Sequence, residues 1–349
     1  MPRLFPAVQR AAILGTAATA FVLAGCSDST SSPSRVSAPD AASLSQSPDI
    51  MDQAGRHVFH TKQWFENEAR NDAGHGRGGS GGGSTGISYH GGPVLQSGTK
   101  VAAIYWGNGA IFSGGPTPGS AGAGSGDGSL VGYFLRNLGG SSYFNINSTY
   151  TDGSGNPIVN AVSYTQYWAN NTNAPTGTTS ISDAQMVAML QSGFNSGKLT
   201  HDASTLYAIF TSGQVNLGGG FGTQYCAYHT HGTVTIGGVA KNVLYAAMPY
   251  NQAYPGACTN GTAAPNGDLG ADAEVNTLAH EIEETTTDMM GNAWYDTRGY
   301  ENADKCAWNW GTTASNGTGI YNITVGTKNF LVQQNWINAG SGGCTQSYP

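Results

Sequence analysis

Between residues 100 and 288 the sequence alternates short apolar runs with segments of helical periodicity, and this alternation limits the chain to a core built from both strands and helices. The apolar runs have the length of buried strands, and the periodic segments carry apolar residues three and four positions apart. The runs are 100–106, 205–211, 233–236 and 243–248, and the helical segments are 129–138, 182–194 and the stretch from Asp272. The pattern predicts an α/β (α+β) domain with a mixed β-sheet packed by at least three helices.

The composition excludes several other classes of protein. Charged residues make up only 10% of the chain, which is too few for a coiled coil or a solvated, disordered chain. The net charge is −7 with 14 Lys and Arg residues, so we expect no nucleic-acid partner.

The first 26 residues predict export. Arg3 and Arg10 give a basic start, an apolar stretch covers 11–24, and this stretch is short for a membrane span. Its end, Leu-Ala-Gly before Cys26, resembles a bacterial lipobox, which implies a signal peptide over 1–25 and a lipid on the Cys26 thiol. The lipid would anchor the protein in the cell envelope, and Ser27 favours the outer membrane. A plain signal peptide, giving an extracellular protein, and an uncleaved anchor remain alternatives.

The segment 26–88 is expected to connect the lipid to a folded domain. It is rich in Ser and Gly, and 74–86 reads as a flexible linker, with a short helix expected inside 51–73. A single domain is therefore expected over 89–349.

Without Cys26, four cysteines remain, and an even number in an exported chain indicates two disulfides. Three pairings are possible. The shorter loops favour one of them, because closing a short loop costs less entropy. That pairing joins Cys226 to Cys258 and Cys306 to Cys344.

Several stretches of the domain resemble the EXORDIUM / phosphate-induced protein family of secreted plant proteins. They are the opening YHGGPVL at 89–95, LYAIFTSGQV at 206–215, CAYH at 226–229, YPGAC at 254–258 and PNGD at 265–268. The resemblance is patchy. It implies an exported protein with this family's fold, and it implies no established chemistry.

The helix that begins near Asp272 carries a pattern typical of metal sites. His280 and Glu284 lie one turn apart on the same face, as the first and last positions of the His-Glu-x-x-His zinc motif do. Glu281 takes the position of the general base that activates a metal-bound water. The last position is Glu rather than His, so the motif is degenerate.

A second acidic cluster follows, with Glu301 17 residues after Glu284. Thermolysin-like zinc proteases take their third ligand from a glutamate about that far downstream, and this resemblance implies His280, Glu284 and Glu301 as ligands. Asp304 would accept a hydrogen bond from the His280 ring, and Asp288 would support the site from behind. Zinc is the expected ion, with calcium or manganese as alternatives because two of the three ligands are carboxylates.

Three functions compete at this stage. The first is a surface-anchored zinc-dependent hydrolase acting on a peptide or a cell-surface polymer, and the second is a non-catalytic EXORDIUM-like factor whose acidic helix is solvated or holds a structural ion. The third is a carbohydrate-binding module, favoured by aromatic residues near the motif. His229 and His231 share one face of a strand, a metal-site geometry, although a structural histidine beside a disulfide is the favoured interpretation of His229. The aromatic residues are Trp294, Tyr295, Trp308 and Trp310.

Overall fold

The computed structural model describes residues 56–74, 86–261 and 263–349. The expected signal peptide, Cys26 and much of the expected tether lie outside the described residues. The α-helices are α1 (Lys62–Gly74), α2 (Leu130–Leu138), α3 (Asp183–Asn195), α4 (Pro255–Cys258) and α5 (Leu269–Thr287).

The central element is a seven-stranded mixed sheet, in which β10, β7, β3 and β5 run parallel and the other pairs are antiparallel. Its order is β1 (His57–His60), β9 (Tyr225–Ile236), β10 (Val239–Met248), β7 (Thr205–Thr211), β3 (Thr99–Trp106), β5 (Val162–Trp168) and β4 (Ala121–Ala123). The sheet and its helices confirm the predicted fold class.

Among the described residues, five strand pairs lie outside this sheet. They are β2 (Ser88–Tyr89) with β11 (Trp294–Tyr295), β6 (Thr179–Ser180) with β8 (Val215–Asn216), β12 (Ala314–Ser315) with β13 (Ile320–Tyr321), β14 (Ile323–Val325) with β15 (Lys328–Phe330), and β16 (Asn335–Ile337) with β17 (Gly343–Thr345).

Local sequence signals explain where the main elements begin and turn. The Ser182 side chain accepts from the Gln185 backbone N–H while the Gln185 side chain accepts from the Ser182 N–H, which forms a capping box at the start of α3. Strands β9 and β10 form a hairpin through Gly237 and Gly238, whose φ angles of 58° and 80° favour glycine. Strands were expected at the apolar runs 233–236 and 243–248, but both β9 and β10 extend further than these runs.

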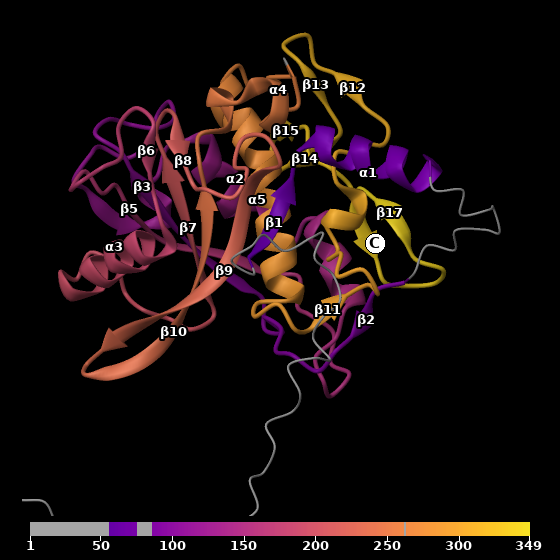
Figure 1. Ribbon diagram of the computed structural model, residues 1–349, viewed down its shortest axis with the longest axis horizontal. Helices are drawn as coiled ribbons and strands as arrows, with labels where there is room; N and C mark the ends of the chain where they lie inside the picture. Colours follow the sequence, from indigo (N-terminus) through magenta and orange to yellow (C-terminus); the bar gives the residue numbers. More distant parts are fainter. Residues whose placement is uncertain (1–55, 75–85, 262) are drawn as a thin grey trace, which may run out of the picture. The chain divides into compact units, whose positions relative to one another are not determined.

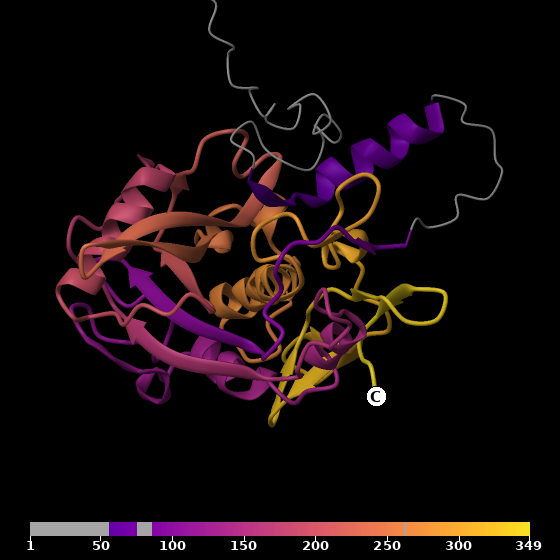
Figure 2. The same ribbon diagram turned by 90° about the horizontal axis from the view of Figure 1, so that it is seen from below.

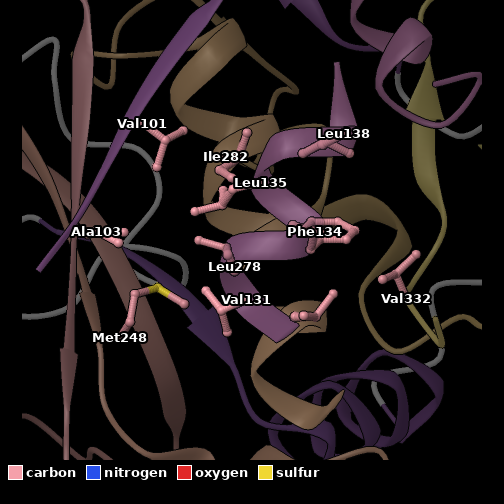
Figure 3. Packing of buried hydrophobic residues seen from close by; sticks show 14 of the residues in the cluster. Val101, Ala103, Val131, Phe134, Leu135, Leu138, Met248, Leu278, Ile282 and Val332 are labelled. Carbon is pink, nitrogen blue, oxygen red and sulfur yellow. The ribbon is translucent and has the colours of Figure 1, made fainter. Parts of the chain in front are cut away.

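The helices cover the two faces of the sheet (Figures 1 and 2). Alternate residues of β3, β7 and β10 point to opposite sides, and one set packs with α2 and α5 while the other packs with α3. Figure 3 shows the α2–α5 side of this core. The labelled side chains that meet there include Val101, Ala103 and Met248 of the sheet with Val131, Leu135, Leu278 and Ile282 of the helices.

The sheet begins earlier in the chain than the sequence suggested. Strand β1 belongs to the segment expected to be a tether, yet it pairs antiparallel with β9, from His57 opposite His229 to His60 opposite Tyr225. Val58 and Phe59 supply the reason, because their buried side chains enter the two sides of the core. Helix α1 follows and corresponds to the short helix expected in this region.

Both predicted disulfides are confirmed. Cys226 of β9 is bonded to Cys258 of α4, and Cys306 is bonded to Cys344 of β17. Cys226 of the first disulfide lies three residues before His229. The second disulfide holds the short 3-10 helix Asp304–Cys306. In the part of the chain that the structure describes, no helix combines the length and the apolar character needed to cross a membrane.

Candidate metal centre

Helix α5 is buried along almost its whole length. Every residue from Gly270 to Thr287 is buried, and the side chains of His280 and Glu284 are at most 1% exposed. Strands β1 and β9 pack against one side of this helix (Figure 1). The alternative of a solvated polar face is therefore excluded, and the polar residues of α5 need another explanation.

One group of potential ligand atoms forms where α5 meets the 3-10 helix. The i,i+4 spacing brings His280 Nε2 to 3.0 Å from Glu284 Oε1, as the sequence predicted. Asp304 Oδ1 lies 3.6 Å from the same His280 nitrogen. The Asp304 backbone N–H donates to Glu284 Oε1 at 3.1 Å, which ties the two segments together. His280, Glu284 and Asp304 therefore converge on one point.

A second group forms between α5 and β9. His229 Nδ1 lies 3.2 Å from Glu281 Oε2 and 3.6 Å from Glu284 Oε2. These three residues also have ligand atoms within reach of one ion. Glu284 belongs to both groups and faces each with a different oxygen, Oε1 toward His280 and Oε2 toward His229.

Glu301 has a different environment from the one expected. It was expected to complete a ligand set with His280 and Glu284, but its Oε2 lies 2.8 Å from His57 Nδ1 and 3.8 Å from His229 Nε2. Asp304, expected to support the His280 ring, is the residue whose carboxylate lies with His280 and Glu284, with all three ligand atoms within 4.8 Å of one another. The reason is β1, which brings a histidine from the expected tether to Glu301.

Asp288 closes α5. Its Oδ1 accepts from the backbone N–H groups of Asn292 and Ala293 at 2.6 Å and 2.7 Å, so it holds the turn after the helix behind the two groups. Burial raises the pKa of Asp288 to about 6.

Burial governs the protonation of the centre. It raises the pKa of Glu281 to about 8, and it raises the pKa values of Glu284, Glu301 and Asp304, which the neighbouring carboxylates raise further. After burial, the Glu284 carboxylate is the neighbour that raises the pKa of both Glu301 and Asp304 the most.

The pKa values of two histidines shift in the opposite direction. Burial, assisted by His229, lowers the pKa of His57 to about 3, and burial lowers the pKa of His229 despite the carboxylates around it. Both rings are therefore neutral near pH 7, which is the form that binds a metal.

The donor set fits a divalent cation. Ligand atoms held tetrahedrally at about 2.0–2.2 Å from zinc lie about 3.3–3.6 Å from one another. The measured separations of 3.0 and 3.6 Å in the first group, and of 3.2 and 3.6 Å in the second, are close to these values. Within the described ranges, the ion pairs recorded for these carboxylates are all with histidine. A bound cation would supply the missing positive charge.

The aromatic residues near the motif do not form an exposed platform. Trp294 and Trp308 are buried, and the Trp308 ring stacks on Phe59 at 4.8 Å between ring centroids. Tyr295 and Trp310 are half-buried. The structure thus removes the observation that favoured a carbohydrate-binding module.

The sequence signalled some of this centre and missed the rest. His280, Glu284 and the acidic cluster follow from helical spacing and distance along the chain. The alternation of His229 and His231 on one strand was a usable signal for a metal site. Only His229 lies in the centre, whereas His231 is exposed further along β9. His57 carried no such signal.

Comparison with known proteins gives a family match. The sequence profile described as the phosphate-induced protein 1 conserved region matches residues 138–329, which is more than half of the chain and includes α5, Glu301 and Asp304. No curated protein and no solved structure matches.

Proposed function

The chain belongs to the phosphate-induced protein 1 family, and from this premise we propose that it is an exported protein of the cell envelope that binds a catalytic divalent ion, zinc by preference, and hydrolyses peptide bonds. Two disulfides fit an exported protein. Lipidation of Cys26, with anchoring in the outer membrane, is part of the same proposal.

The observation that carries the proposal is the convergence of His280, Glu284 and Asp304 in a buried position. Isolated buried carboxylates are costly, and two of them beside an imidazole form a ligand set that zinc accepts. When bound, the ion would polarise a substrate carbonyl and lower the pKa of a water ligand.

Glu281 is the base in this scheme. It follows His280 directly on α5, its Oε2 faces His229, and its Oε1 has no hydrogen-bond partner among the described residues. The pKa of Glu281 is about 8 without an ion, and a bound cation would keep this carboxylate ionised near neutral pH, so that it could accept the proton of an attacking water. The same group then returns the proton to the leaving amine.

Access to the site requires a movement of the chain. The ligand side chains are at most 2% exposed, and His57 of β1, whose side chain is 9% exposed, is the member of the centre nearest to solvent. A substrate would reach Glu281 when β1 or the turn after α5 moves, because these segments cover the His57 side of the centre.

The test is metal content together with chelator-sensitive hydrolysis of a fluorogenic peptide mixture. We expect the wild type to hold stoichiometric zinc, His280→Ala to lose the ion of its group, and Glu281→Gln to keep that ion while hydrolysis falls by about 10²-fold or more. His231→Ala is the matched control, since this exposed histidine lies outside the centre. A wild type without metal after reconstitution contradicts the proposal.

One observation favours a second candidate, a non-catalytic factor with a structural ion. The centre is closed, and closed sites are typical of structural metals. In that case zinc is present and His280→Ala unfolds the domain, while no variant changes hydrolysis because the wild type has none.

A further inference from the structure

We propose that the centre holds a second divalent ion, bound by His229, Glu281 and Glu284, so that the Glu284 carboxylate bridges two ions. This inference rests on the proposed ion at His280, Glu284 and Asp304. It adds a separate ligand group with its own histidine.

The orientation of Glu284 is the first reason. Its Oε1 lies 3.0 Å from His280 Nε2 and its Oε2 lies 3.6 Å from His229 Nδ1, so the carboxylate stands between two imidazoles. A carboxylate that offers one oxygen to each side is suited to bridge two ions, which in two-metal hydrolytic sites are about 3.5–4 Å apart.

The environment of His229 is the second reason. With Nδ1 turned to the ion, the proton of this neutral ring sits on Nε2, which points toward Glu301 Oε2 at 3.8 Å. Histidine ligands of metals usually have such a carboxylate behind the ring. His57 Nδ1 lies 2.8 Å from the same oxygen and holds Glu301 in place.

Unsatisfied polar atoms are the third reason. His229 Nε2, Glu281 Oε1 and Glu301 Oε1 are buried without a hydrogen-bond partner among the described residues. Buried polar atoms are rarely left in this state, so a buried cluster with several of them points to an ion or a water that completes it.

The charge of the cluster is the fourth reason. Four buried carboxylates face the histidines, and one divalent ion would leave two negative charges uncompensated in a medium of low dielectric. Two divalent ions balance all four. The four carboxylates are Glu281, Glu284, Glu301 and Asp304.

The second ion leaves the base role of Glu281 in place. The ion takes Oε2, which faces His229, while Oε1 remains free to accept the proton of a water held between the ions. The two-ion arrangement therefore extends the proposed hydrolysis without replacing its base.

The experiment measures ions per chain on the full-length protein, stripped with a chelator and reconstituted with Zn²⁺, using elemental analysis. We expect two ions in the wild type, one in His229→Ala and one in His280→Ala. His231→Ala, on the same face of β9, should keep two. Reconstitution with Mn²⁺ gives a second readout that needs no variant, because bridged ions show an exchange-coupled electron paramagnetic resonance spectrum.

The outcomes separate this inference from the proposed function. Two ions with a coupled Mn²⁺ spectrum support the bridged pair. Saturation at one ion with an uncoupled spectrum overturns the second site and leaves the proposed zinc site standing, whereas a wild type that binds no ion overturns both. If His229→Ala fails to fold, the wild-type stoichiometry and spectrum still decide.

Discussion

The metal-free protein should lose stability as the pH rises from about 6.5 to 8, and Glu281→Gln should remove a defined part of that loss. Glu281 has a pKa of about 8 in the folded state against 4.5 when solvated. Between these values the unfolded state has released the proton that the folded state keeps, so the stabilising contribution is complete below pH 4.5 and is lost as the pH rises to 8.

The predicted loss of stability starts at about pH 6.5 because, below that pH, the histidines make stability rise with pH. The pKa of His57 falls to about 3 on folding, so its contribution is complete above 6.5 and is lost as the pH falls. Above 6.5 the carboxylates dominate. One retained proton over 1.5 pH units, at about 1.4 kcal/mol per unit, corresponds to about 2 kcal/mol from Glu281 alone.

The assay is urea denaturation at pH 6.5, 7.2 and 8.0 with a chelator present and the disulfides intact. Between pH 6.5 and 8.0 the free energy of unfolding of the wild type should fall by about 2 kcal/mol more than that of Glu281→Gln. The reason is that the amide imitates the protonated acid and has no proton to lose. Glu274→Gln is the matched control. Glu274 is buried with a pKa of about 8 but accepts from the Asn251 backbone N–H, away from the histidines.

Saturating zinc should affect the pH-dependent contributions of Glu281 and Glu274 differently. It should abolish the pH-dependent difference between the wild type and Glu281→Gln, because the ion keeps the ligand carboxylates ionised, and it should leave the Glu274 difference unchanged. Parallel pH profiles of the metal-free wild type and Glu281→Gln would refute the reasoning.

Three further predictions test other parts of the molecule. Phe59→Ala should cost about 3–5 kcal/mol in thermal unfolding, because this fully buried ring stacks on Trp308; a change below 1 kcal/mol would mean that β1 is not part of the domain. The double variant Cys306→Ser with Cys344→Ser should lose about 2–5 kcal/mol and bind zinc less tightly in a chelator competition, since the bond holds the 3-10 helix that carries the third ligand; unchanged zinc affinity counts against that ligand. Cys26→Ala should abolish incorporation of a labelled fatty acid in a bacterial host, and continued labelling speaks against lipidation at this residue.

The fold was largely predictable because its signals are local. The apolar run at 205–211 is β7, and the helical pattern at 129–138 is α2 with one residue fewer. The first parts of β9 and β10 were missed. In β10, residues 239–242 are exposed and partly polar, and in β9, residues 225–232 (YCAYHTHG) mix polar with apolar residues and form no continuous apolar run, although 225–229 are buried.

The candidate centre was predictable only along α5. The pair His280 and Glu284 follows from one turn of helix, whereas the choice between Glu301 and Asp304 depends on how the chain turns after β11. His57 is separated from Glu301 by most of the chain, and they meet because Val58 and Phe59 bury β1 beside β9. Such a meeting depends on tertiary packing, which no spacing rule describes.

The other buried acids around α5 strengthen the case for a cation. Five of them have donors of their own, either side-chain amides, backbone N–H groups or a lysine, so burial leaves none of them without a favourable partner. They are Asp272, Glu274, Glu283, Asp288 and Asp296. The other four gather at one place. Glu284 and Asp304 also accept from backbone N–H groups there, but two of the histidines that face the four, His57 and His229, are neutral and cannot compensate their charge. Without an ion these four must keep protons that solvated carboxyl groups release at about pH 4–5, and above that pH this costs the folded state stability. A divalent ion removes the cost at neutral pH, and metal binding is therefore the simplest physical reason for an acidic helix in the core of this family member.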